Sequence, residues 1–213
     1  MDRFNKLISN TTARSPAVEA YKILRTNLQY ASFDNEIKSL VITSCESSEG
    51  KSLTSANLAI SMAQDGKNVL LVDCDLRRPM QKRIFNLMGA KGLTNILAEG
   101  LDYSNIVNIV DIDNLGVITS GPKPPNPAEV LGSSRMEAFM NKVVDNYDMV
   151  ILDTPPLLPV TDAMVLSRIV DGVVLILRHG VTTIDAVEIA KGQIERVGAN
   201  LLGAVINDVP VDD

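Results

Sequence analysis

The chain has 213 residues, 46% of them hydrophobic and 22% charged, a composition that excludes an intrinsically disordered protein and favours a single large globular domain. Its 20 basic and 26 acidic residues give a net charge of −6, which argues against a protein that coats nucleic acid or anionic lipid. Two cysteines and one histidine nearly exclude a disulfide scaffold or a zinc site, so any metal chemistry would depend on oxygen ligands.

The sequence contains no segment with the pattern of a secretory signal or a membrane-spanning helix. The N-terminus lacks the apolar stretch of a secretory signal, and no stretch in the chain approaches the roughly 20 apolar residues of a membrane-spanning helix. We therefore expect a cytoplasmic protein in which residues 1–14 form a flexible arm and residues 15–213 form one domain. Apolar residues at helical spacing, from Val18 to Leu28, predict a first helix at the start of that domain.

Short apolar runs rich in β-branched residues alternate with segments of helical spacing along the rest of the chain. This alternation predicts an α/β protein of three layers, with a mainly parallel central sheet flanked by helices. The predicted strands are Ser39–Thr43, Asn68–Asp73, Leu115–Thr119, Met149–Asp153, Gly172–Leu177 and Leu201–Ile206. The proline-rich stretch at residues 121–127 is interpreted as a stiff loop before a helix that begins near Ser133 or Ser134.

The sequence Glu49-Gly50-Lys51-Ser52 lies between the first predicted strand and a helical segment, as a phosphate-binding loop (P-loop) requires. The lysine would reach the β- and γ-phosphates of a nucleotide, and the serine hydroxyl would bind Mg²⁺. The common pattern has a glycine where this chain has Cys45, so an ordinary strand-to-helix turn is the alternative. The residues assigned to nucleotide binding in this loop are Ser48, Glu49, Gly50, Lys51, Ser52 and Leu53.

Acidic residues follow two further predicted strands. Asp73 and Asp75 lie in VLLVDCDLRRP, and Asp153 lies in MVILDTPP. Each aspartate alone could be a turn residue, but the carboxyl ends of parallel strands are where such sheets bind ligands. Together with the lysine and serine of the loop, these carboxylates predict a magnesium–nucleotide site for ATP, with Ser52, Asp73 and Asp153 as metal ligands.

These motifs resemble the bacterial tyrosine kinases of capsule and exopolysaccharide synthesis, which are relatives of the septum-site and plasmid-partition ATPases. The resemblance rests on VITS, EGKS, VLLVDCDLRRP and ILDTPP, and it covers about residues 15–209. The segment PPNPAE best separates the kinases from the partition ATPases. The resemblance implies a P-loop fold and ATP-dependent transfer of phosphate to protein tyrosines, in the control of polysaccharide synthesis and export.

The resemblance also implies roles for individual residues. Lys51 and Ser52 correspond to the Walker A lysine and metal ligand, Asp73 and Asp75 to the additional Walker A′ motif, and Asp153 to the Walker B carboxylate. Lys51, Asp73 and Asp75 are the catalytic candidates, and either aspartate could be the base that receives the tyrosine proton. Asn207 matches a position that contacts adenine in relatives, although an asparagine at a strand end is also an ordinary turn residue.

The first predicted helix carries Glu19, Lys22 and Arg25. The resemblance implies that a Glu-x-x-Arg-x-x-Arg motif at this position assembles subunits into a ring, and the lysine at the middle position would weaken that contact. The alternative is a solvated helix face with weak ion pairs. The resemblance further implies an activating partner, the cytoplasmic end of a membrane-embedded regulator of polysaccharide chain length, which would recruit the kinase to the inner face of the membrane.

The sequence departs from the kinase pattern in two places. Ser47-Ser48 replace a Pro-Gly pair in the loop, where the missing glycine restricts the backbone. The tyrosine-rich tail that the resemblance implies has no counterpart in the closing residues NDVPVDD: either the natural protein lacks it or the chain was cut short. Without a tail, the protein would act on other proteins or only hydrolyse ATP. The four tyrosines of the chain are instead scattered along it: Tyr21, Tyr30, Tyr103 and Tyr147. The alternatives to a kinase are a partition-type ATPase without kinase activity and a non-catalytic scaffold.

Overall fold

The computed structural model describes residues 7–11, 15–31 and 36–210. Within them the chain forms one seven-stranded sheet in the order β3-β4-β2-β5-β1-β6-β7. Neighbouring strands are parallel except β3, which pairs antiparallel with β4. The strands are β1 (Ser39–Ser44), β2 (Val69–Asp73), β3 (Asn108–Ile109), β4 (Leu115–Ile118), β5 (Met149–Asp153), β6 (Gly172–Arg178) and β7 (Leu201–Asn207).

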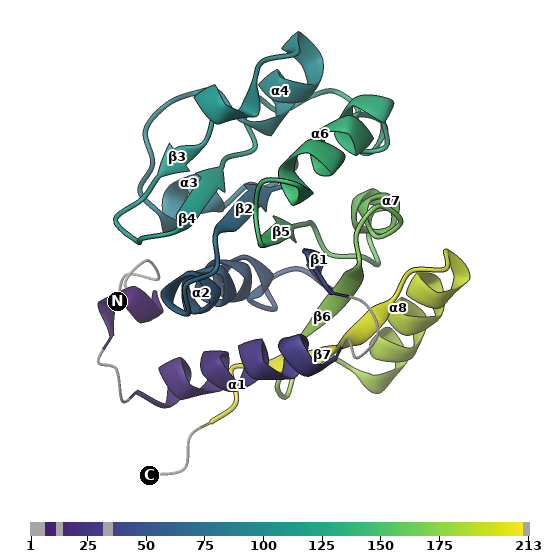
Figure 1. Cartoon of the computed structure of the whole chain (residues 1–213). Helices are drawn as coiled ribbons and strands as arrows, with labels where there is room; N and C mark the ends of the chain where they lie inside the picture. Colours follow the sequence, from purple (N-terminus) through teal and green to yellow (C-terminus); the bar gives the residue numbers. More distant parts are fainter. Residues whose placement is uncertain (1–6, 12–14, 32–35, 211–213) are drawn as a thin grey trace.

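Helices cover both faces of the sheet (Figure 1). The buried side chains of η2, α1, α2 and α3 pack on one face, and those of α4 to α8 pack on the other. The helices are η2 (Ile8–Asn10), α1 (Pro16–Tyr30), α2 (Lys51–Gln64), α3 (Gln81–Ile84), α4 (Leu93–Glu99), η3 (Tyr103–Asn105), α5 (Pro127–Leu131), α6 (Ser134–Val144), α7 (Asp162–Leu166) and α8 (Ile184–Arg196). The predicted three-layer α/β architecture is confirmed.

The central strands are buried along their whole length because alternate side chains enter two different cores. In β1, Leu40 and Ile42 pack in the core beneath α1 and α2, whereas Val41 packs in the core on the other face. This is the burial expected of a parallel sheet with helices on both sides, and it explains why the strands are continuous apolar runs in the sequence. The strand ends that carry polar residues therefore emerge at one edge.

All six predicted strands are present, with ends that differ from the predictions by no more than one residue. The two-residue strand β3 was not predicted, because Asn108–Ile109 is too short and too exposed to leave an apolar pattern. Strand β7 is only partly covered, unlike the predicted strands buried on both faces, because it lies at the edge of the sheet.

The helix predictions hold where capping residues are clear. Ser15 caps α1 by accepting a hydrogen bond from the backbone N–H of Val18, and Pro16 occupies the first turn. Ser133 caps α6, as the sequence indicates. The proline-rich stretch was predicted to be loop as far as residue 127, and its last residue instead begins the short helix α5, because proline is well suited to a first helical turn.

The expectation of a flexible arm over residues 1–14 is wrong for residues 7–11. Leu7 and Ile8 are buried against the core, and the backbone N–H of Ile8 donates to the side chain of Asn57 on α2 at 3.0 Å. Two adjacent apolar side chains are enough to dock this short segment. Residues 1–6 and 12–14 of the predicted arm lie outside the described residues.

None of the helices in the described parts of the chain combines the length and the hydropathy that crossing a bilayer requires.

Candidate active site

The loop between β1 and α2 is shaped by two residues with positive φ. Gly50 caps α2 with a φ of 94°, and a Cβ at this position would lie 1.9 Å from Nδ2 of Asn207. Glycine is favoured here, because the left-handed conformation disfavours a side chain and a Cβ would displace the amide of Asn207. The loop thereby turns sharply into the N-terminus of a 14-residue helix, which offers positive potential to an anion.

Ser48 also has a positive φ, of 67°, and its side chain is exposed. The serine that replaces glycine in the kinase pattern therefore adopts the left-handed conformation that glycine takes most readily. The departure from the pattern therefore carries a cost in backbone strain at Ser48.

We expect Ser48→Gly to raise the free energy of unfolding by up to about 1 kcal/mol, because it relieves left-handed strain without removing a buried contact. Thermal denaturation of the two proteins checks this. Ser47→Gly is the matched control, since Ser47 is exposed and is not among the residues with positive φ. Equal changes at the two positions would contradict the assignment of strain to Ser48.

Lys51 places its ammonium group among the strand-end carboxylates. Its Nζ lies 2.9 Å from Oδ2 of Asp75, 3.9 Å from Oδ1 of Asp153 and 3.3 Å from Oγ of Ser52. Burial by itself favours the neutral amine, but the charges of Asp153 and Asp75 outweigh it and hold the pKa of Lys51 above its ordinary value. The sequence motifs around residues 51, 75 and 153 are therefore brought together in one site, as predicted.

Asp73 is fully buried, and its carboxylate organises the segment that follows β2. Its Oδ2 accepts hydrogen bonds from the backbone N–H groups of Met80 at 3.0 Å and Gln81 at 2.8 Å. Its Oδ1 accepts from the backbone N–H of Asp75 at 3.2 Å. Burial, together with the negative charge of Asp153 on the neighbouring strand, raises the pKa of Asp73 well above its ordinary value.

Asp75 is turned toward the phosphate loop. Its Oδ2 accepts the hydrogen bond from Lys51, while Oδ1 accepts from the backbone N–H groups of Arg77 at 3.2 Å and Arg78 at 2.9 Å. Of the two Walker A′ aspartates, Asp75 is therefore the one in direct contact with the predicted phosphate-binding lysine.

Asp153 lies at the end of β5 with no exposed surface. Its Oδ1 accepts from Oγ of Ser55 at 3.4 Å, and its Oδ2 accepts from Nε2 of Gln81 at 2.8 Å. Burial raises the pKa of Asp153, and the positive charge of Lys51 with the hydrogen bonds from Gln81 and Ser52 offsets part of that rise. Sequence reasoning missed Ser55 and Gln81, and no motif marks either of them.

The oxygen donors at this edge suit a hard cation such as Mg²⁺. Ser52 supplies a hydroxyl beside Lys51, and Asp73 and Asp153 face each other in register on adjacent strands. The described residues contain no group of three or more acidic, histidine or cysteine side chains arranged to hold a metal ion unaided. Such sparse coordination is usual for Mg²⁺ at nucleotide sites, where waters and phosphate oxygens complete the shell.

The side chain of Glu49 is buried between the phosphate loop and the β6–α8 connection. Its side chain is 1% exposed and accepts hydrogen bonds from the hydroxyl of Thr182 and from the backbone N–H of Glu46. Its backbone carbonyl accepts from the amide of Asn207 at 3.0 Å. The loop is thus fastened to the β6–α8 connection and to the end of β7. Thr182 was not foreseen, because it lies more than 130 residues away in the chain.

A bulge in β7 sets the direction of Asn207. Val173 pairs with Leu201 and Val174 pairs with Gly203, so that Leu202 is an extra residue in the edge strand. An extra residue in a strand makes every later side chain point to the opposite face of the sheet. Bulges of this kind often orient a side chain toward an active site. Asn207 therefore reaches the phosphate loop and is more than a turn residue.

Arg77 is not a free surface cation. It forms a two-pronged ion pair with the fully buried Asp162, with Nε to Oδ2 at 2.7 Å and Nη2 to Oδ1 at 3.0 Å. The pair ties the Walker A′ segment to the start of α7. Further along the same segment, Lys82 donates to the carbonyl of Gly89 at 2.6 Å, whereas Arg78 is exposed. Arg77 and Lys82 therefore have partners within the fold.

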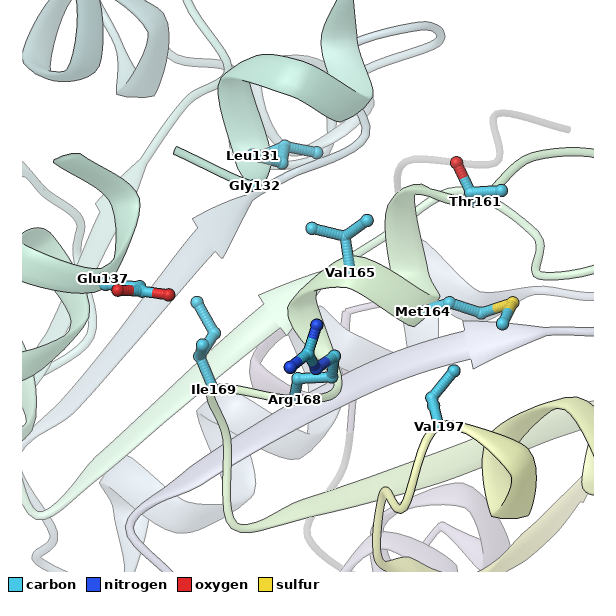
Figure 2. A pocket seen from close by; sticks show the side chains of 9 residues that line it. All are labelled: Leu131, Gly132, Glu137, Thr161, Met164, Val165, Arg168, Ile169 and Val197. Carbon is cyan, nitrogen blue, oxygen red and sulfur yellow. The ribbon is translucent and has the colours of Figure 1, made fainter. Parts of the chain in front are cut away.

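A separate cavity of about 370 Å³ lies among α5, α6, α7 and the end of α8. Figure 2 shows Val165, Arg168 and Ile169 of α7 and its following turn among the residues that line it. The lining includes neither the phosphate loop nor the strand-end aspartates. The cavity is therefore distinct from the candidate active site.

The fold and the site together define a P-loop nucleotide-binding protein. A family model described as an AAA domain matches residues 37–197, more than half of the chain. The septum site-determining protein MinD of Pyrococcus horikoshii, solved as a complex with Mg-ADP, has the same fold with a TM-score of 0.67. That likeness covers 79% of this chain and 69% of the other at 18% identity.

The chain belongs to the bacterial tyrosine-protein kinases. It is 43% identical to tyrosine-protein kinase YwqD of Bacillus subtilis over 201 residues, which are 94% of this chain and 85% of the relative. The crystal structure of the chimerical protein CapA2B2 superposes with a TM-score of 0.93 at 38% identity, and the match covers 99% of this chain and 93% of the other. The resemblance seen in the sequence motifs is confirmed.

Proposed function

We propose that this kinase transfers the terminal phosphoryl group of Mg-ATP to protein tyrosines, and that it does so to regulate capsular or exopolysaccharide synthesis and export. The observation that carries the proposal is the contact of Lys51 with Asp75 at 2.9 Å and Asp153 at 3.9 Å, at the N-terminus of α2. A cation, a helix N-terminus and buried carboxylates in one place are the components that phosphoryl transfer requires.

Each side chain has a role that follows from its position. Lys51 and the N-terminus of α2 would bind and orient the phosphates, with the exposed Ser48 at the tip of the loop. Asp75 is the better candidate for the base, since its carboxylate faces the lysine, whereas the carboxyl oxygens of Asp73 hold three backbone N–H groups. Asp73 would keep the Walker A′ segment in place.

Ser52, Asp73 and Asp153 are the proposed ligands of Mg²⁺, which would neutralise negative charge on the phosphates when bound. MinD, a protein of the same fold, was solved as a complex with Mg-ADP, which is consistent with a magnesium–nucleotide complex in this kinase. Asn207 and Leu53 complete the proposed nucleotide-binding set, Asn207 through its contact with the phosphate loop and Leu53 from the half-buried first turn of α2.

For assembly, we propose a ring of subunits that uses the exposed face of α1. Glu19 and Lys22 pair with each other at 2.7 Å and remain largely exposed. Arg25 instead contacts Asp65 at 3.0 Å and the carbonyl of Ser61 at 2.8 Å, so it holds α1 against α2 within its own chain. Glu19 and Lys22 are therefore the residues available to a neighbouring subunit.

The proposed activator is the cytoplasmic end of a membrane-embedded regulator of polysaccharide chain length, which would recruit a cytoplasmic kinase to the inner face of the membrane. The similarity of the chain to the chimerical protein CapA2B2, whose name joins two components, is consistent with a partner of this kind.

The test is intact-mass spectrometry after incubation with Mg-ATP and a synthetic peptide of tyrosines separated by alanines, alongside measurement of ADP release. We expect phosphate on the peptide, and none on a matched peptide with phenylalanine in place of tyrosine. Steady ADP release without phosphate on any tyrosine would contradict the proposal and would favour a nucleotide-switched ATPase of the partition type.

A further inference from the structure

Gln81, the first residue of α3, joins two elements of the candidate active site. Its side chain has no exposed surface. Nε2 donates to Oδ2 of Asp153 at 2.8 Å and to the backbone carbonyl of Ser52 at 2.9 Å. The amide thus bridges the end of β5 and the first turn of α2, two segments that are 72 and 29 residues away from Gln81 in the chain.

The position of Gln81 is itself fixed by the site. Its backbone N–H donates to Oδ2 of Asp73 at 2.8 Å. The Walker A′ aspartate therefore holds the glutamine backbone, and the glutamine side chain holds the Walker B aspartate. A side chain fixed in this way at both ends leaves the carboxylate of Asp153 little freedom to rotate.

The other polar atom of the amide has no partner. Oε1 of Gln81 is one of three buried side-chain atoms without a hydrogen bond among the described residues. Leaving a buried acceptor unpaired is unfavourable, because the atom gives up its hydrogen bonds to water without replacing them, so such atoms in native proteins call for an explanation. A fully buried acceptor that belongs to a residue in contact with Asp153 is available to a hydrogen-bond donor that enters the site.

We propose that Gln81 is a positioning residue for the magnesium–nucleotide complex: it orients Asp153 against the first turn of α2 and offers Oε1 to a donor that arrives with that complex. This inference rests on the proposed nucleotide site. A neutral amide suits the role because it fixes the carboxylate without neutralising it, whereas a lysine or arginine would compete with the metal ion for the same charge.

The test compares Gln81→Met, which keeps the length of the side chain but removes both hydrogen bonds, with the wild-type protein. ADP binding is measured by calorimetry with and without Mg²⁺, and the ratio of the two dissociation constants gives the gain that magnesium provides. We expect the gain to fall by about tenfold or more in the variant, in line with the loss of an outer-shell partner. ADP affinity without Mg²⁺ should stay unchanged. Gln193→Met on α8 is the control, with an expected gain equal to the wild type.

An unchanged gain in Gln81→Met would overturn the inference, and so would an equal loss of ADP affinity with and without Mg²⁺, because that indicates general distortion of the loop. If the methionine variant fails to fold, Gln81→Asn decides by the same ratio, since its amide is too short to bridge both acceptors. A wild-type protein that binds ADP without any gain from Mg²⁺ would overturn the proposed metal site itself, an outcome distinguishable from a failure at Gln81 alone.

Discussion

Replacement of Lys51 by methionine is expected to reduce tyrosine phosphorylation by at least about 10²–10³-fold, the loss found when one preorganised electrostatic contact to a transition state is removed. The reason is geometric: Nζ of Lys51 is the cation that lies within 4 Å of both Asp75 and Asp153 at the start of α2. Single-turnover transfer of phosphate to a tyrosine peptide measures the effect. Activity at the wild-type level would remove the site assignment.

The melting temperature of Lys51→Met is also expected to depend on pH differently from that of the wild type. The raised pKa values of Asp73 and Asp153 mean that the folded protein favours their protonated forms, so their ionisation destabilises the fold as the pH rises. Lys51 offsets this effect for Asp153. We therefore expect the melting temperature of Lys51→Met to fall further below the wild type at about pH 8 than at about pH 5. A deficit that does not change with pH would contradict this account of the lysine.

The two Walker A′ aspartates are expected to respond differently to replacement by asparagine. Asp75→Asn should lower the rate of phosphoryl transfer by about 10²–10⁴-fold, the usual contribution of a general base. Its melting temperature should fall less than that of Asp73→Asn, because the remaining amide oxygen can still accept from the backbone N–H groups of Arg77 and Arg78. Asp73→Asn should lower both the rate and the melting temperature, because one amide cannot accept from all three backbone N–H groups that the carboxylate holds.

Paired measurements of rate and melting temperature for the two variants separate the roles that the sequence left open. A stable Asp73→Asn protein without activity, together with an active Asp75→Asn protein, would reverse our assignment and make Asp73 the base. Lys82→Gln, at an exposed position of the same segment, serves as a control for changes in loop charge.

Much of the site was predictable because it depends on local order. A run such as VLLVD is apolar on both faces and forms a buried parallel strand, and the aspartate that ends it must then emerge at the carboxyl edge. The same reasoning places Asp153, and a Gly-Lys-Ser sequence after β1 places the phosphate loop. These features need only the alternation of strands and helices, which is visible in the sequence.

The burial of individual residues and their contact partners could not be predicted from the sequence in the same way. The exposed edge of β7, the bulge at Leu202 and the docking of Leu7 on the core depend on which elements become neighbours. The apolar pattern of a strand is similar at the centre and at the edge of a sheet, so the pattern alone does not decide between them.

The sequence by itself determined the fold class, the phosphate loop and the strand-end carboxylates, since these follow from patterns within short segments. Only the tertiary structure decided the contacts of Gln81 with Asp153, Thr182 with Glu49 and Arg77 with Asp162, which join residues between 72 and 133 positions apart. The physical reason is that a hydrogen bond requires atoms about 3 Å apart in a particular direction. No spacing in the sequence encodes that requirement between segments that the packed sheet brings together.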